Sequence, residues 1–446
     1  MPVSPARAAA FDILLRVERE SSYASELLHS AAYQGLSTPD HGLATELVMG
    51  VLRWRSLLDI EISKASSQPL SKLDLEILIA LRLALYQFGW LDRIPKRAAL
   101  HESVELVKRA RKRSAATFVN AVLRKLSTQS LRASVPPVVS SPDELATSSA
   151  HPLWLVERWV KEYGSSIAYK ICQYNQSIPE AAIRVRSNKA EVELTKEEVS
   201  LSTGSILSEA RRVNSGDITR TTPFRNRGLV IQDEGSQLVA ALVGSSDENA
   251  RILDCCAAPG GKTLAIADHN PQAAITAVEL HPHRARLMQT LFPEDTKIQT
   301  VVADARALPF TQPFDRIIVD APCSGTGTLA RNPEIKWRLA PSDLTELHDR
   351  QLAILRSATK RLAPGGRLIY STCSLEKEEN EDVIDELLAE DNSLRLGNIE
   401  SEINGLRVSG ILTVSDTNSL TRGPYLRTIP GVHQCDGFFA VILARV

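Results

Sequence analysis

The sequence lacks the features that mark membrane, secreted and metal-binding proteins. No apolar run in the chain approaches the roughly 20 residues that span a bilayer. Asp12 and Arg16 interrupt the Ala-rich stretch near the N-terminus, which argues against a signal peptide. The six cysteines form no CxxC pair, and the nine histidines are dispersed. We therefore expect a cytoplasmic protein in a reducing compartment, with no membrane segment and no bound metal.

The sequence also lacks an excess of charge of either sign, since its formal net charge is −1 over 446 residues. The basic residues are nevertheless unevenly distributed. The stretch Arg93–Lys125 holds ten Lys and Arg against two Glu, a local net charge of +8. Lys and Arg meet most backbone phosphates in nucleic-acid complexes, so this stretch predicts an RNA-binding face, with a merely solvated helix face as the alternative. The candidate RNA contacts are Lys108, Arg109, Arg111, Lys112 and Arg113.

Residues 1–126 are predicted to form an all-α domain. Apolar side chains recur at three- and four-residue spacing over Ala6–Arg19, Ala44–Leu58 and Leu73–Phe88, which is typical of amphipathic helices. Residues 127–150 contain seven Ser and three Pro without periodicity, and this composition predicts a linker.

A small α+β subdomain is predicted over residues 151–227. It begins with a helix over Leu153–Glu162 and continues with an alternating strand over Ala181–Arg186. The alternation places Arg184 and Arg186 on one face of the strand, which is a second candidate RNA surface. The alternative is a subdomain that only packs against the rest of the protein, with the basic edge of its strand exposed to solvent.

Residues 228–446 alternate between strands and helices. This order predicts an α/β Rossmann-like domain with a mostly parallel sheet covered on both faces. The irregular stretch 397–435 receives no assignment. The apolar runs that predict strands lie at 250–256, 273–280, 298–303, 315–321, 366–371 and 438–443.

The loop Asp254–Thr263 follows the first of these strands and lacks two nucleotide-binding patterns. A P-loop needs a glycine five positions before the Gly261-Lys262 pair, where Cys256 stands, and no G-x-G-x-x-G occurs. A strand, a turn of small residues and a helix still bring backbone N–H groups in front of a ligand. We therefore predict a ligand without a pyrophosphate. The loop residues expected to bind it are Cys256, Ala257, Ala258, Pro259, Gly260, Gly261 and Lys262.

Carboxylates recur where successive strands of this domain end, at Asp254, Glu279, Asp304 and Asp320. Open α/β sheets bind ligands at this edge. Glu279 follows Gly260 by 19 residues, a spacing typical of an acid that binds ribose hydroxyls. A nucleoside without phosphates indicates S-adenosylmethionine, although another adenosine-containing ligand stays open.

Two cysteines follow strands of the same sheet, Cys323 after Asp320 and Cys373 within Tyr370–Ser374. We expect both to face the ligand crevice. A predicted helix over Leu375–Glu390, capped by Ser374, and the charge of Lys262 would favour the thiolate of Cys373. One such cysteine is usually a buried small hydrophobe. Two on one ligand edge favour a chemical role.

The chain resembles two known families. Leu43–Arg53, Leu91–Pro95 and Phe118–Arg124 are similar to the NusB family of RNA-binding helical antitermination factors. The motifs of the second resemblance span about 151–446 and are similar to the RNA (cytosine-5) methyltransferase family, the RsmB/NSUN group. They are Gln232–Val239, Asp254–Thr263, Asp320–Gly327, Arg331–Trp337, Ser371–Asn380 and Asp436–Phe439.

These resemblances imply an activity and roles for four residues. Cys373 would add to C6 of a cytosine, so that C5 takes a methyl group from S-adenosylmethionine. Cys323 would assist product release, Asp320 would hold the base, and Lys262 would contact its edge. The implied partner is 16S ribosomal RNA with its cytosine in a single-stranded loop, and we expect a monomer. The alternatives are the same chemistry on transfer RNA and a non-catalytic antitermination or assembly factor.

Overall fold

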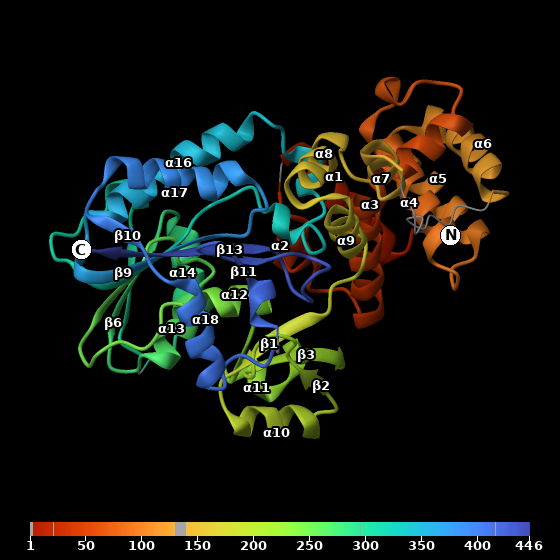
Figure 1. Ribbon diagram of the computed structural model, residues 1–446. Coiled ribbons are helices and arrows are strands. Elements are labelled where there is room, and N and C mark those ends of the chain that lie inside the picture. The colour runs from red at the N-terminus through yellow and green to blue at the C-terminus, as the bar shows by residue number, and fades with distance from the viewer. Residues whose placement is uncertain (1–2, 21, 130–139, 295, 415) are drawn as a thin grey trace. The chain divides into compact units, whose positions relative to one another are not determined.

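The computed structural model describes residues 3–20, 22–129, 140–294, 296–414 and 416–446 (Figure 1). It divides into two compact units. The helical unit comprises Met1–Ile178 and Leu329–Leu339, and the sheet unit comprises Pro179–Thr328 and Ala340–Val446. Within the described residues, no helix is long and apolar enough to cross a membrane.

The first six α-helices of the helical unit surround one apolar core. The three helices predicted near its start are confirmed: α1 and α3 are longer than predicted, and α4 begins and ends two residues later. α4 is buried along most of its length because apolar residues occupy nearly all of its faces. Residues 130–139 of the predicted linker lie outside the described residues. The rest of the linker contains a helix, α7, which the lack of periodicity did not predict. These helices are α1 Pro5–Glu20, α2 Ala24–Leu28, α3 Thr38–Ala65, α4 Leu75–Trp90, α5 Lys96–Arg109, α6 Ala116–Ser127, α7 Pro142–Ser148, α8 Leu153–Tyr163 and α9 Ser165–Asn175.

A segment from far along the chain, Leu329–Leu339, packs within the helical unit and is called the inserted segment below. It contains the short helix α15 Ile335–Arg338. The Lys336 side chain is 1% exposed, and its Nζ donates to the backbone carbonyls of Arg53 at 2.8 Å and Ala150 at 2.9 Å. Burial, followed by the charge of Arg53, lowers the pKa of Lys336 well below its usual range.

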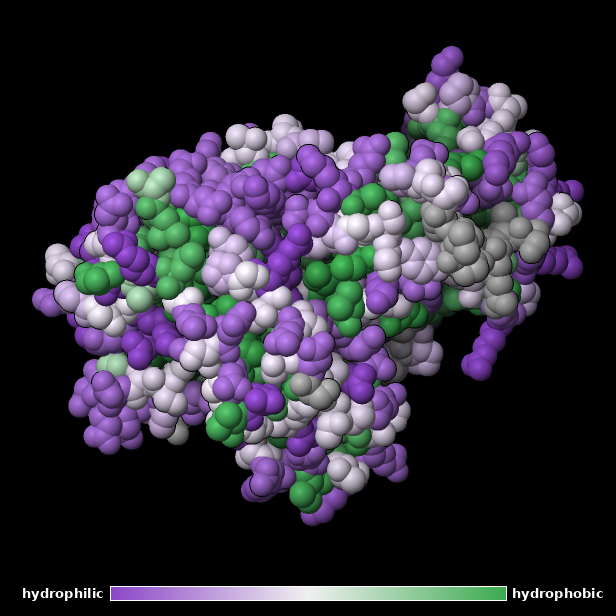
Figure 2. Space-filling view, in the orientation of Figure 1, coloured by the Kyte–Doolittle hydropathy of each residue, from purple (hydrophilic) through white to green (hydrophobic). Residues whose placement is uncertain are grey.

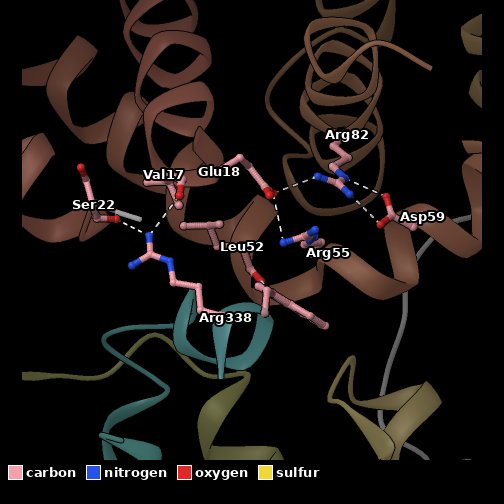
Figure 3. Close-up of polar contacts among 9 residues, drawn as sticks. Val17, Glu18, Ser22, Leu52, Arg55, Asp59, Arg82 and Arg338 are labelled. Atoms are coloured by element: carbon pink, nitrogen blue, oxygen red, sulfur yellow. Dashed lines mark hydrogen bonds and ion pairs between the residues drawn. The ribbon is translucent and has the colours of Figure 1, made fainter. Parts of the chain in front are cut away.

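Arginines lie near the C-terminal end of α1, where the inserted segment packs (Figure 3). Arg338 donates to the backbone carbonyls of Val17 and Ser22, next to the C-terminal end of α1. Glu18, on the same turn, accepts a hydrogen bond from the buried Arg82 at 3.2 Å. Cations suit this position because the free carbonyls at a helix C-terminus carry partial negative charge.

A four-stranded antiparallel sheet with order β2-β3-β1-β4 opens the sheet unit. The strand predicted over Ala181–Arg186 is confirmed as β1, and α10 and α11 pack beside this small sheet. The elements are β1 Ala181–Val185, α10 Asn188–Lys196, β2 Ser200–Thr203, β3 Ala210–Ser215, α11 Thr222–Arg225 and β4 Leu229–Ile231.

The large sheet has the strand order β11-β12-β13-β9-β8-β5-β6-β7, and β10 pairs with β13. The strands from β9 to β7 pair in parallel, whereas those from β11 to β9 pair antiparallel. The expectation of a mostly parallel sheet therefore holds only for the half that carries the predicted ligand edge. The strands are β5 Arg251–Asp254, β6 Ala274–Glu279, β7 Ile298–Val302, β8 Phe314–Asp320, β9 Leu362–Thr372, β10 Leu394–Leu396, β11 Thr421–Arg422, β12 Tyr425–Thr428 and β13 Phe438–Arg445.

Successive residues of each strand face opposite sides of the large sheet, so two cores form. In β5, Ile252 joins the core on one side and Leu253 joins the core on the other. α12 Glu234–Ala241, α13 Gly261–His269 and α18 Ile399–Val408 contribute to the first core. α16 Asp343–Thr359 and α17 Glu381–Glu390 cover the second, as Figure 1 shows. The unassigned stretch 397–435 thus supplies α18, β11 and β12.

Candidate active site

The loop after β5 is held by a buried carboxylate at its start. Asp254 is 1% exposed and accepts hydrogen bonds from Thr263 Oγ1 at 2.7 Å and from the Cys256 N–H at 3.3 Å. Burial raises the pKa of Asp254 to about 6. Gly260 stands at the N-terminus of α13 with φ of 105°, a conformation that favours glycine. The predicted strand, turn and helix are confirmed, with backbone N–H groups at the head of α13.

The four predicted carboxylates act together on Cys256. Burial first, and then the charges of Asp254, Asp320, Glu279 and Asp304, raise the pKa of the Cys256 thiol well above its usual range. This edge of the sheet is therefore rich in negative charge and in hydrogen-bond acceptors. Such a surface suits a cationic ligand with ribose hydroxyls, such as S-adenosylmethionine. The same surface repels a ligand that carries a pyrophosphate.

Glu279 and Asp304, like Asp254, have protein partners. Glu279 accepts from the His281 N–H at 2.8 Å. Asp304 lies against the guanidinium of Arg306, with Nη2 to Oδ2 at 2.6 Å, and this contact lowers the pKa of Asp304. The contact of Glu279 with the ribose, and that of Asp304 with the cofactor, stay predictions.

Lys262 and Asp320 form an ion pair between the loop and the end of β8. Lys262 Nζ lies 2.7 Å from Asp320 Oδ2, and Ser371 Oγ donates to Asp320 Oδ1 at 2.9 Å. Burial lowers the pKa of Lys262, but the charge and hydrogen bond of Asp320, and then Cys373, outweigh burial and raise it. Lys262 also lies 5.1 Å from the ring centroid of Phe438, a residue whose place beside the site only the family motif indicated.

The two predicted thiols lie side by side. β8 and β9 are parallel neighbours in which Asp320 pairs with Ser371, so the residues that follow both strands emerge together. The Sγ atoms of Cys323 and Cys373 are 3.3 Å apart. The hydrogen bond with Cys373, followed by burial, raises the pKa of Cys323 well above its usual range. Cys323 is therefore a protonated thiol that faces the sulfur of Cys373.

The segment after Cys373 differs from the prediction. The helix expected over Leu375–Glu390 begins only at Glu381, because Leu375 and Glu376 bond elsewhere. The N–H of Leu375 donates to Thr326 Oγ1, and that of Glu376 donates to Ser374 Oγ. The N-terminus of α17 thus does not follow Cys373 directly, and the predicted helix-end stabilisation of its thiolate is wrong.

Arg184 in β1 and Arg186 directly after it share a carboxylate partner inside the sheet unit. Arg184 is 3% exposed, and its Nη1 lies 2.6 Å from Asp268 Oδ2. Arg186 Nη2 lies 2.6 Å from Asp268 Oδ1. Asp268 belongs to α13, the helix that begins at the ligand loop. A side chain as buried as that of Arg184 does not present its charge to RNA, so we give Arg184 a structural role instead, whereas an RNA contact by the partly buried Arg186 stays a prediction.

Three of the basic residues proposed on the helical unit also have acidic neighbours. Lys108 pairs with Glu105 at 2.7 Å, Arg109 with Asp12 at 2.8 Å and Lys112 with Asp74 at 2.9 Å. Arg111 and Arg113 are exposed. A second basic surface nearby, the α5–α6 groove, has a volume of about 660 Å³. Its lining residues are Lys96, Arg97, Leu100, His101, Val104, Glu105, Lys108, Asn120, Arg124 and Ser127.

This fold and this ligand edge define a methyltransferase that depends on S-adenosylmethionine. The family model described as 16S rRNA methyltransferase RsmB/F matches residues 241–444. The NusB family model matches residues 4–128, and a ferredoxin-like domain model of RsmF/B-like methyltransferases matches residues 151–220.

Curated relatives extend the similarity to most of the chain. "Probable ribosomal RNA small subunit methyltransferase B" of Bacillus subtilis (strain 168) is 37% identical and covers 87% of this chain and 89% of its own length. "Ribosomal RNA small subunit methyltransferase B" of Cronobacter sakazakii (strain ATCC BAA-894) is 32% identical, with 92% of each chain covered. The chain belongs to the RsmB/F family of 16S rRNA methyltransferases.

A solved structure supports the fold over the full length. The crystal structure of PH0851 superposes with a TM-score of 0.79 at 21% identity and covers 99% of each chain. A methyltransferase homologue from Pyrococcus horikoshii superposes with a TM-score of 0.57 at 23% identity, over 69% of this chain and 100% of its own. The NusB-like helical part, the ferredoxin-like subdomain and the α/β methyltransferase fold are confirmed.

Proposed function

We propose that the protein transfers a methyl group to C5 of one cytosine in 16S ribosomal RNA through a covalent adduct with Cys373. The observation that carries the proposal is the contact of the two thiols, with 3.3 Å between the Sγ atoms of Cys323 and Cys373. An RNA methyltransferase that acts on an exocyclic nitrogen or a ribose oxygen needs no thiol beside its methyl donor. Carbon 5 of cytosine does, because it is too weak a nucleophile until a group adds at C6.

In the proposed reaction the thiolate of Cys373 forms a bond to C6, and the electron pair of the C5–C6 double bond becomes available at C5. S-adenosylmethionine, when bound, supplies the methyl group that C5 takes. A base then removes the C5 proton, the C5–C6 double bond re-forms, and the bond between Cys373 and C6 breaks. The chain thus splits one difficult substitution into easier steps.

The neighbouring groups suit these steps. Cys323, a protonated thiol, would donate toward the sulfur of Cys373 as that sulfur leaves C6, which fits a role in product release. Asp320 is fixed by Lys262 and Ser371 and would hydrogen-bond the base near N3 and accept from the exocyclic amine. Lys262 would lie at the base edge. The loop of residues 256–262 and the carboxylates Glu279 and Asp304 would hold the methyl donor.

We further propose that the helical unit contacts the RNA through the α5–α6 groove. Among the described residues, Arg97 and Arg124 form no ion pair, so their charges are available to phosphates. Hydrophilic side chains cover the outer edge of the helical unit around α5 and α6 (Figure 2). Arg111 and Arg113 would extend this surface, with Lys108, Arg109 and Lys112 contributing less because each shares its charge with an acid.

The substrate is tested with labelled S-adenosylmethionine supplied to the full chain together with stripped 16S RNA or with transfer RNA. The expected result is label on C5 of one cytosine in the ribosomal RNA, located by nuclease digestion and mass spectrometry. Label on transfer RNA alone would replace the substrate, and label on a nitrogen or a ribose would contradict the chemistry. A non-catalytic binding factor would transfer no label to either RNA.

A further inference from the structure

A buried carboxylate that has no place in the reaction described above links the two cysteine loops. Glu379 is 0% exposed and lies in the 3-10 turn Lys377–Glu379. Its Oε1 accepts from the Ser324 N–H at 2.8 Å and from Gln351 Nε2 at 2.9 Å. Its Oε2 accepts from the hydroxyls of Ser324 and Ser374. All four of these contacts come from uncharged donors.

The partners of Glu379 are the residues that directly follow the two thiols. Ser324 follows Cys323, and Ser374 follows Cys373. The hydroxyls of these serines also lie 3.0 Å apart. One carboxylate therefore binds both cysteine loops, in each case at the residue directly after the cysteine.

Glu379 is itself fixed from two sides. The Tyr370 hydroxyl donates to the Glu379 backbone carbonyl at 2.6 Å. Gln351, from α16, donates to the Pro322 carbonyl at 3.0 Å as well as to the carboxylate. The carboxylate is thus attached to a strand and a helix of the scaffold, so it restrains the loops instead of moving with them.

The chemistry of this position favours a carboxylate. A buried carboxyl group without partners costs several kcal/mol, so it persists only where its oxygens are satisfied. Four donors converge on this group, and a carboxylate offers only acceptors to all of them. A glutamine of nearly the same volume has one acceptor oxygen, so the two serine hydroxyls could meet its NH₂ group only by reversing from donors to acceptors.

We infer that Glu379 is a positioning residue that keeps the sulfurs of Cys323 and Cys373 in contact. The catalytic consequence rests on the proposed function, whereas the effect on the geometry of the two thiols does not. Loss of the carboxylate would let the two loops separate, and displacement of reacting groups by about 1 Å is enough to cost roughly 100-fold in rate.

The experiment compares the full chain with Glu379→Gln and with a matched control, Glu390→Gln, which changes an exposed carboxylate at the end of α17 that pairs with Arg356. Diamide measures the distance between the thiols without any methyl transfer. This azo compound takes two electrons and two protons from Cys323 and Cys373, whose sulfurs form one S–S bond. Peptide mapping by mass spectrometry follows the rate, and kcat and KM are measured in parallel.

We expect the unaltered chain and Glu390→Gln to form the disulfide at the same rate. Glu379→Gln should form it about tenfold more slowly and lose about 100-fold in kcat, with KM for S-adenosylmethionine within about twofold. A folded Glu379→Gln that forms the disulfide at the unaltered rate would overturn the inference. If the unaltered chain methylates no cytosine, the proposed function fails, and the disulfide rates still decide the role of Glu379.

A milder variant covers the case in which Glu379→Gln does not fold, as judged by circular dichroism. Ser324→Ala removes one of the four donors and leaves the carboxylate in place. We expect it to slow disulfide formation and to lower kcat, both by less than in a folded Glu379→Gln. Unaltered disulfide formation and kcat in Ser324→Ala would then overturn the inference.

Discussion

Arg184 in β1 and Arg186 directly after it lie against Asp268, whereas Arg97 in α5 and Arg124 in α6 form no ion pair in the described part of the chain. Both regions are rich in arginine. In the sheet unit the two arginines share one carboxylate, which attaches the end of β1 to the helix of the ligand loop. In the helical unit the charges of Arg97 and Arg124 in the α5–α6 groove are left for a partner. Local charge alone therefore does not distinguish an RNA surface from an internal ion pair.

The largest effect should follow from removal of the charge of Asp268. Asp268→Asn leaves Arg184 buried without its counter-ion, and Nε and Nη2 of Arg184 already lack hydrogen-bond partners. We expect the sheet unit to lose about 3 kcal/mol of unfolding free energy. Hydrogen exchange in α13 and β1 measures the loss.

Tryptophan fluorescence supplies the internal control, because all five tryptophans lie in the helical unit. Its unfolding transition should not shift in Asp268→Asn. The exposed pair of Asp217 and Arg220 offers a matched variant, Asp217→Asn, which should cost less than about 1 kcal/mol. Equal losses in the two variants would remove the distinction between the buried pair and a surface pair.

The next effect should be on RNA binding. Arg97→Glu combined with Arg124→Glu should weaken the affinity for 16S RNA by about tenfold, or about 1.4 kcal/mol, at moderate salt. The slope of log affinity against log salt should also fall by roughly 1.4, as expected when two contacts to single-stranded phosphates are lost. Filter binding across a salt series measures both quantities. Lys189→Glu, a charge reversal on the exposed face of α10, is the control.

Unchanged affinity in that double variant, with tryptophan fluorescence confirming a folded helical unit, would remove the α5–α6 groove from the RNA surface. A fall in affinity without a change in slope would mean that the two arginines act on the fold of the groove and not on phosphates.

A smaller effect should appear with pH. The hydrogen bond from His269 to Glu209 raises the pKa of His269, and the same bond lowers the pKa of Glu209. A raised folded pKa means that the contribution of His269 is complete below its unfolded pKa and is lost as pH rises through the folded value. The sheet unit should therefore lose less than about 1 kcal/mol between pH 6 and 8.

Calorimetry at both pH values measures this loss of stability in the sheet unit. Glu209→Gln should remove most of the difference in stability between the two pH values. If stability instead rises between pH 6 and 8 and Glu209→Gln does not alter the rise, His269 is not the group that titrates.

The smallest effect should come from a basic residue that is already paired. Lys112 lies 2.9 Å from Asp74, and the hydrogen bond with Asp74 raises the pKa of Lys112. Lys112→Ala should change RNA affinity by less than twofold, clearly less than Arg97→Ala in the same titration. An equal loss in the two variants would show that a surface ion pair does not withhold a lysine from RNA.

Periodicity and short motifs predicted much of this molecule, and the reason is local. The helices near the N-terminus, β1 and six strands of the large sheet each follow from spacing within one segment, whereas β10, β11 and β12 were not predicted. The placement of Cys323 and Cys373 at one edge followed from topology, since residues after parallel neighbours emerge together.

The contacts that were missed join residues far apart in the chain. Asp268 lies 84 positions from Arg184, so the strand pattern alone left the arginines available for RNA. Lys336 reaches the carbonyl of Arg53 across 283 positions, and no local signal marks the inserted segment as part of the helical unit. Glu379 received no role from the sequence, because a donor such as Ser324 lies 55 positions away from it.

The central claim is that Cys373 forms the covalent bond to RNA and that Cys323 assists its release. The most direct measurement is denaturing gel electrophoresis of protein mixed with 16S RNA and S-adenosylmethionine. Cys323→Ala should accumulate a denaturant-stable protein–RNA adduct, and Cys373→Ala and the double variant should form none. An adduct that requires Cys323 and survives the loss of Cys373 would contradict the account.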